Sequence, residues 1–289
     1  MQWDPNALDF DTHRKRYEAV FGVNLHDSSQ DLKTLDRARY AQATALKTHA
    51  IAVHDPLRDL FLKVVDFASS LSNQEAAYYM RYGGGRRMGM IFHGYNEIVW
   101  NAPVDRTKSL SRDEQHSLSG AINNIYMHLF GALDNFVLSI LHEKETDAAA
   151  GLTPQQIYLF SPALGSLDAF RILHGELDGL RQWFRDAKTR RNPVAHRIPF
   201  YIGPAVLSNE DADLYRGLDT QFYDAIKNMD FQLADEIDQR KDELGRFAPY
   251  FIHHPGEGAI SIYPTLPTDI ANLIRIGRTV FALLKGEIT

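Results

Sequence analysis

The feature that most constrains the fold is one long segment with helical periodicity, residues 111–144. Its apolar side chains recur at steps of three and four residues, which is the spacing of one buried helical face: Ile122, Ile125, Leu129, Leu133, Phe136 and Ile140. Ser111 followed by Glu114 has the pattern of a capping box at the start. A helix of about 34 residues is roughly 50 Å long, so the rest of the chain has to pack along it.

Further segments with the same periodicity predict a mainly helical protein. Asp55-Pro56 has the pattern of an N-cap followed by proline at the first helical position, and it predicts the start of a new helix. The glycines of Gly83-Gly84-Gly85-Arg86-Arg87 predict a flexible break. Residues 247–253 and 259–263, on either side of the turn at 255–258, predict a small β-hairpin. The expected helices span residues 9–21, 31–52, 55–72, 166–190 and 268–285, with two surface helices within 208–243.

Composition excludes several classes of protein. The 289 residues include no cysteine, which excludes disulfide scaffolds, thiol nucleophiles and cysteine-based zinc sites. No apolar run reaches the roughly 18 residues that a membrane span needs, and residues 1–6 lack the pattern of a secretion signal. We therefore expect a cytoplasmic protein that does not enter a membrane. The net charge of −6 indicates that any contact with nucleic acid is local.

One segment runs against this acidic background. Residues 181–197 contain six Lys or Arg and one acid, Asp186. Within it, Arg191 and His196 are separated by four residues. An arginine neutralises phosphate charge and a histidine transfers protons near pH 7, so the pair predicts metal-free cleavage of RNA. Pro193 and Pro199 predict that this motif lies on a kinked or restarted turn.

Asp134 is the second candidate residue. On a helical wheel it falls among apolar side chains, whereas Asn124, His128, Gly131 and Asn135 form a narrow polar edge. An unpaired carboxylate on an apolar face costs several kcal/mol, and the basic segment is the richest source of cations. We therefore expect Asp134 to orient Arg191 or a neighbouring arginine, while a partly solvated Asp at the helix edge remains the alternative.

Two segments carry a resemblance to a known family. Residues 123–136, which include the Gly131-Ala132-Leu133-Asp134-Asn135 run, are followed some sixty residues later by Arg191-Asn192-Pro193-Val194-Ala195-His196-Arg197-Ile198-Pro199. Together they resemble a bacterial branch of the HEPN superfamily (higher eukaryotes and prokaryotes nucleotide-binding domains). The family motif is Arg, four to six residues, then His, and the likeness covers about residues 111–202.

The resemblance implies a fold, a set of roles and a partner. The fold would be an up-and-down helical bundle, with an N-terminal helical extension (1–102) ahead of a HEPN-like domain (103–289). An acidic insertion (about 205–245) and the β-hairpin (about 247–263) would lie within that domain. His196 would be the general acid or base, Arg191 would stabilise charge on the phosphate, and Asn192 would position phosphate or histidine. We expect Asp134, Arg190 and Arg197 to support them.

The resemblance further implies a homodimer that cleaves RNA without a metal or cofactor, in toxin or phage-defence settings, and DNA is not an expected substrate. The alternative is a non-catalytic module that binds nucleotide or RNA, or that assembles proteins. Other candidate sites are weaker. The glycine run at 83–85 lacks the Gly-Lys-Ser/Thr ending of a phosphate loop, and His93 with Glu97 lacks a third metal ligand.

Overall fold

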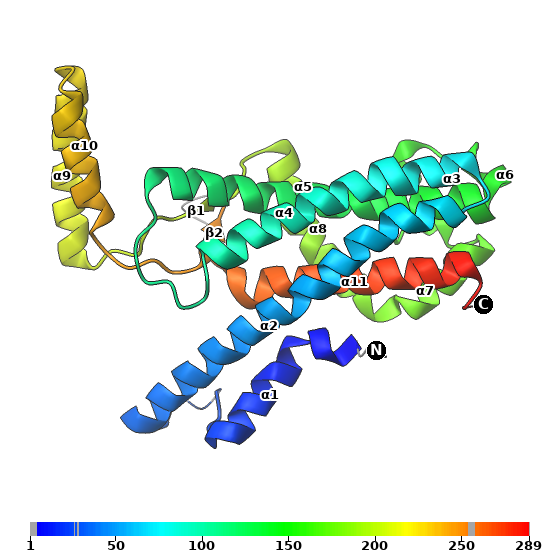
Figure 1. The fold of residues 1–289 in the computed structure, drawn as a ribbon, viewed down its shortest axis with the longest axis horizontal. Coiled ribbons are helices and arrows are strands. Elements are labelled where there is room, and N and C mark those ends of the chain that lie inside the picture. The colour runs from blue at the N-terminus through cyan, green and yellow to red at the C-terminus, as the bar shows by residue number, and fades with distance from the viewer. Residues whose placement is uncertain (1–4, 26, 28, 254–257, 289) are drawn as a thin grey trace.

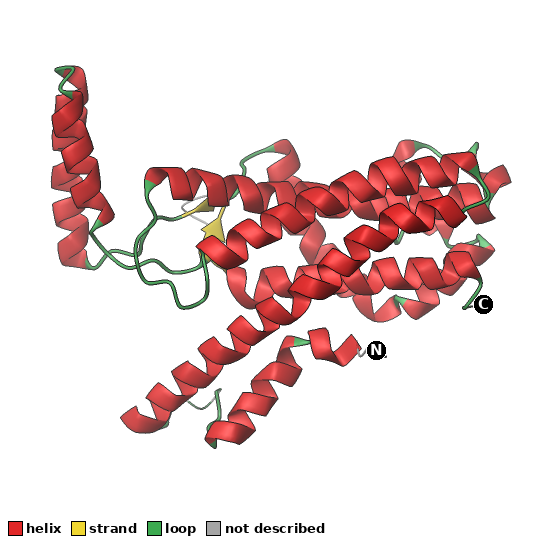
Figure 2. Ribbon diagram, viewed as in Figure 1, coloured by secondary structure: helices red, strands yellow, loops and turns green. Residues whose placement is uncertain are grey.

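The structure is a computed structural model, and it describes residues 5–25, 27, 29–253 and 258–288, without the side chains of residues 5, 6 and 196. The chain is mainly helical (Figure 2). Its α-helices are α1 (Phe10–Phe21), α2 (Leu32–Phe67), α3 (Gln74–Tyr78), α4 (Arg86–Asn101), α5 (Arg112–Lys144), α6 (Thr146–Ala149), α7 (Asp168–Glu176), α8 (Arg181–His196), α9 (Asn209–Lys227), α10 (Phe231–Asp242) and α11 (Ile262–Lys285). Short 3-10 turns and one π-helical turn join several of them.

Helix α5 is the centre of the structure. Its capping box forms as predicted, since Ser111 accepts from the Glu114 N–H and Glu114 accepts from the Ser111 N–H. Leu129, Leu133 and Phe136 are fully buried on its inner face. By length and composition α5 is able to cross a membrane, but 67% of its most apolar window is buried inside the fold, as expected of the core helix of a soluble protein.

Around α5 the long helices alternate in direction (Figure 1). Helices α4, α8 and α11 pack against α5, helix α2 packs on α4 and α11, and α7 packs on α11. One buried core joins the side chains of these helices, from Leu8 at the N-terminal end to Leu284 near the C-terminal end. It therefore draws on residues on both sides of residue 102.

Three expected boundaries differ from the observed ones. Helix α2 passes through Pro56 without a break, because the apolar face of Val53, Leu57 and Leu60 continues on both sides of the proline. The expected helix at 166–190 is interrupted at residues 177–180 by a 3-10 turn. Helix α11 spans Ile262–Lys285, but the backbone at Tyr263 is extended, so its continuous helix begins after that residue and a few residues before the expected start.

The glycine run Gly83-Gly84-Gly85 is not a flexible break. It lies in a π-helical turn, Tyr79–Gly85, that leads directly into α4. A Cβ atom on Gly83 would lie 1.8 Å from Oδ1 of Asn135, so a larger residue there would have to displace the Asn135 side chain of α5. The prediction failed because the glycines serve helix packing rather than chain flexibility.

Two smaller elements complete the fold. Strands β1 (Tyr201–Ile202), β2 (Tyr250–Ile252) and β3 (Ile260–Ser261) form an antiparallel sheet in the order β1-β2-β3. The expected turn at 255–258 falls largely outside the described residues.

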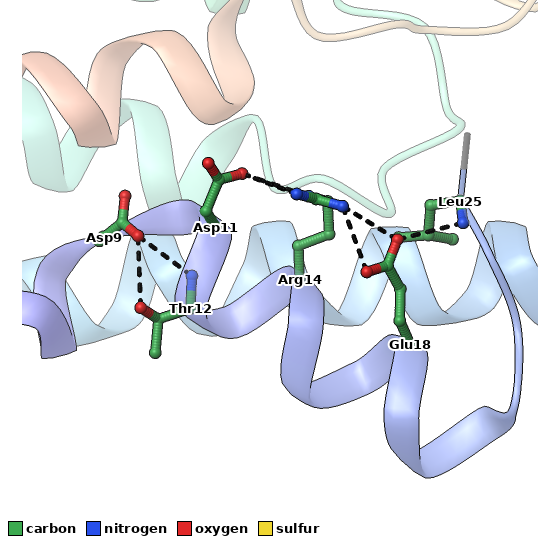
Figure 3. A network of polar contacts seen from close by, with 6 residues as sticks. All are labelled: Asp9, Asp11, Thr12, Arg14, Glu18 and Leu25. Atoms are coloured by element: carbon green, nitrogen blue, oxygen red, sulfur yellow. Dashed lines mark hydrogen bonds and ion pairs between the residues drawn. The ribbon is translucent and has the colours of Figure 1, made fainter.

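Near the N-terminus, Asp9 caps α1 through Thr12, and Arg14 bridges Asp11 and Glu18 (Figure 3).

Helices α9 and α10 form an acidic helical hairpin that projects from the bundle (Figure 1). They have a small apolar cluster of their own, separate from the main core, made of Leu218, Ala225, Ala234 and Ile237. The hairpin begins and ends at one place, where Val206 and Arg246 pair as an antiparallel bridge. It occupies the sequence between about 205 and 245 where an acidic insertion is expected.

Candidate functional site

Helix α8 carries the Arg/His motif in its last turns. It continues through Pro193 and ends at His196, and the N–H of Arg197 donates to the Pro193 carbonyl at 2.8 Å. The expected kinked or restarted turn is therefore replaced by helix, because a proline blocks only the bond to the carbonyl four residues earlier. The helix stops before Pro199. The backbone of His196 belongs to α8, whereas its side chain lies outside the described parts of the chain.

Arg190 and Arg191 are neighbours in sequence, but they serve different clusters. Nη2 of Arg190 lies 2.7 Å from Oδ1 of Asp269, a residue of α11 that is 1% exposed. The same carboxylate accepts from the Tyr126 hydroxyl at 2.7 Å and from the Trp183 indole N–H at 2.8 Å. Burial raises the pKa of Asp269, and Arg190 opposes that rise. Arg190, expected to support the site, is thus bound within the core.

Asp134 stands in a second cluster, at the seam where α5 contacts α4 and α8. It is partly buried. Burial raises the pKa of Asp134 to about 6, while the positive charges of Arg191, Arg87 and Lys188 act in the opposite direction. Arg87 comes from α4 and the other two cations from α8. Three cations therefore act electrostatically on one carboxylate, and we call this group the Asp134 seam.

Helices α5 and α8 run antiparallel along the seam. Asn123 on α5 binds both backbone groups of Phe200, accepting from its N–H at 2.8 Å and donating to its carbonyl at 2.8 Å. About three turns further along α5, Asp134 lies in the field of Arg191. The Phe130 ring contacts Phe184 and the Arg190 guanidinium lies over the Tyr126 ring, so the end of α8 lies toward the first half of α5.

His128 and Arg87 extend the seam toward α4. Nη1 of Arg87 lies 3.4 Å from Nδ1 of His128. Burial lowers the pKa of His128, and the charge of Arg87 lowers it further, so the ring is neutral at pH 7. Sequence reasoning placed His128 on the polar edge of the helix but assigned it no role, and it treated Arg87 as part of a loop. The polar edge itself was the signal that another helix supplies a polar partner there.

The remaining predicted residues are distributed as follows. Asn192 and Arg197 are exposed near the end of α8. Glu97 accepts a hydrogen bond from Ser117 at 2.8 Å. Among the described residues, no three side chains of His, Asp or Glu are grouped as a metal site requires.

Comparisons with protein-family models, with curated proteins and with solved structures gave no match. Function is therefore inferred from the site itself. The seam brings Arg87, Lys188 and Arg191 into the electrostatic surroundings of one acid of the described chain, Asp134. Arginine forks match the geometry of phosphate oxygens.

Proposed function

We propose that this protein is a metal-independent endoribonuclease of HEPN type, with its active site at the Asp134 seam and the adjoining end of α8. Arg191 and His196 are the catalytic pair, and Asn192 positions phosphate or the histidine. Asp134 orients Arg191 from the neighbouring helix. Arg197 contributes positive charge at the exposed end of the motif.

The reaction follows from the chemistry of RNA. His196 accepts the proton of the ribose 2′-OH, whose oxygen attacks the adjacent phosphorus atom. The bond to the 5′ oxygen breaks, that oxygen takes up a proton, and a 2′,3′-cyclic phosphate remains. Arg191 stabilises the charge that develops on the phosphate oxygens in the transition state. DNA lacks the 2′-OH and is not cleaved by this route.

One observation supports the proposal most directly: the carboxylate of Asp134 lies in the combined field of Arg191, Arg87 and Lys188. A carboxylate in this position attracts the arginines of both neighbouring helices, which supports a role for Asp134 in orienting Arg191. The closed Asp269 cluster, in contrast, uses its arginine entirely within the fold.

The test is an RNase assay in EDTA on single-stranded RNA with a 3′-end analysis. We expect the unmodified chain to cut and to leave cyclic phosphate ends. His196→Ala and Arg191→Ala each lower the rate by at least about a hundredfold, the size of a lost acid-base group or charge donor. Arg185→Ala, on an exposed position of the same helix, is the matched control. Equal cutting by all four proteins, or no cutting by any, contradicts the proposal.

We further propose that the protein is a cytoplasmic homodimer in which the motifs of two protomers face each other, in a toxin or phage-defence setting. Light scattering at increasing concentration tests the dimer. A monomer that cuts RNA at full rate contradicts this part of the proposal.

A specific observation favours the second candidate function, a non-catalytic assembly module. Three large apolar side chains at the end of the acidic hairpin are strongly exposed: Tyr223 (65%), Met229 (76%) and Phe231 (62%). Exposed apolar patches of this kind mark protein contacts. If the hairpin is the functional surface, Met229→Ser with Phe231→Ser abolishes assembly, and the Arg191 and His196 variants leave it unchanged.

A further inference from the structure

Gly131 lies in the middle of α5, where glycine is unfavourable by about 1 kcal/mol relative to alanine. Its backbone is helical, so no unusual conformation requires it. A Cβ atom there would lie 2.3–2.6 Å from the guanidinium atoms of Arg87. Gly120, on the same helix, has nothing within 4 Å of the equivalent position. The Arg87 guanidinium therefore occupies the space that a side chain at position 131 would fill.

The contact with His128 fixes the hydrogen-bonding role of the ring. Arg87 has only N–H donors, so Nδ1 of His128 accepts at the 3.4 Å contact. In the neutral ring the proton is then on Nε2, which makes that nitrogen a hydrogen-bond donor. The pair therefore combines a cation from α4 with a neutral donor from α5 at the position of Gly131.

We infer that Arg87 and His128 form a second phosphate-binding subsite, which holds a phosphodiester of single-stranded RNA next to the one bound at Arg191. Gly131 is the residue that permits it. The inference rests on the proposed function for the identity of the RNA, but it concerns binding rather than cleavage. Phosphate is the fitting ligand because it accepts from an arginine fork and from a neutral N–H together.

The first test measures binding alone, with a fluorescent single-stranded 2′-O-methyl RNA oligonucleotide that cannot be cleaved. Arg87→Ala is expected to raise the Kd about tenfold or more, as for a lost charged hydrogen bond, and to reduce the salt slope of log Kd by about 0.7. The matched control is Arg86→Ala, because Arg86 is exposed and its guanidinium lies over the Tyr82 ring. We expect that control to change the Kd less than twofold.

The second test uses glycine substitutions that do not disturb the fold. Gly131→Ala displaces only the flexible end of Arg87, so we expect a folded protein that binds the oligonucleotide about fivefold to tenfold more weakly. Gly120→Ala changes the same residue type on the same helix and is expected to bind normally. Circular dichroism and thermal unfolding confirm that both variants are folded.

Failure of the inference is distinct from failure of the proposed function. If the unmodified chain cuts no RNA but both Arg87→Ala and Gly131→Ala weaken binding, the subsite stands without the nuclease. If the chain cuts RNA and neither variant changes Kd, the subsite is overturned while the nuclease stands. Two further results overturn the subsite. One is that polyglutamate competes as strongly as an oligonucleotide of equal charge, and the other is that no oligonucleotide binds at all.

Discussion

The Asp269 cluster and the Asp134 seam each place a carboxylate against helix α8, but only the first is closed. Asp269 is 1% exposed and receives hydrogen bonds from Tyr126, Trp183 and Arg190. Asp134 is partly exposed, and Arg191, Arg87 and Lys188 act on it without offsetting the rise in its pKa that burial causes. The difference shows that adjacent arginines of one helix, Arg190 and Arg191, act on different carboxylates, one closed inside the core and one at the partly exposed seam.

The largest expected effect on stability comes from removing the negative charge of Asp269 in the closed cluster. Asp269→Asn leaves the guanidinium of Arg190 without its countercharge inside the protein, which costs about 3–5 kcal/mol of unfolding free energy. Denaturant unfolding measures it. Asp168→Asn is the control, because its pair with Arg171 is more than 70% exposed on both sides and is worth less than about 1 kcal/mol. Equal losses in the two variants would remove the distinction between the clusters.

The second prediction concerns pH and the open seam. Because burial raises the pKa of Asp134 to about 6 from 3.8, the folded state binds this proton more tightly than the unfolded state does. The resulting stabilisation is fully present below about pH 3.8 and is lost as the pH rises through 6. Relative to Asp134→Asn, the unmodified chain should lose up to about 3 kcal/mol between pH 4 and pH 7. A difference that is constant across this range contradicts the assignment.

A third prediction sharpens the account of the closed cluster. Trp183→Phe keeps an aromatic ring but removes the N–H that donates to Asp269 at 2.8 Å. We expect a loss of about 2 kcal/mol, typical of a hydrogen bond to a charged group. In the double variant with Asp269→Asn the two losses should not add, since both act on one carboxylate. Full additivity in denaturant unfolding would show that Trp183 acts through packing alone.

The smallest effect is expected at the exposed edge of the seam. Lys188 is solvent-exposed, and of the three cations that lower the pKa of Asp134 it has the smallest effect. Lys188→Met should change the unfolding free energy by less than about 1 kcal/mol, and salt should remove most of that change. A loss as large as that in Asp269→Asn would show that the seam is closed like the other cluster.

Sequence periodicity was sufficient to predict the helices whose caps and apolar faces agree. The capping box of Ser111 and Glu114 is one example, and the helix expected from residue 31 has Asp31 as its N-cap. The prediction failed at Pro56, where the apolar face on both sides outweighs one lost hydrogen bond, and at Pro193, after which α8 continues only to His196. A proline in the sequence indicates a helix break, but it gives no information on the tertiary packing that keeps the helix continuous.

For the candidate site, the sequence pointed to Arg191 and Asp134 but missed the partners that lie far away along the chain. Asp269 lies within the first half of an apolar helix, α11, and nothing local indicates that three donors from α5 and α8 converge on it. Arg87 follows three glycines that resemble a loop. The missed signal was Gly131, a helix-breaking residue inside the most strongly helical segment, which required an explanation from a neighbouring element.

The bridge between Val206 and Arg246 has a practical consequence for engineering this protein. The α9–α10 hairpin leaves and rejoins the bundle at this bridge. We therefore expect that it can be deleted and replaced by a tight turn, together with the four-residue apolar cluster that it contains. The same anchor can accept a foreign domain in its place. Such an exchange also removes the contacts of Arg112 on α5 with Asp238 and Phe222 of the hairpin.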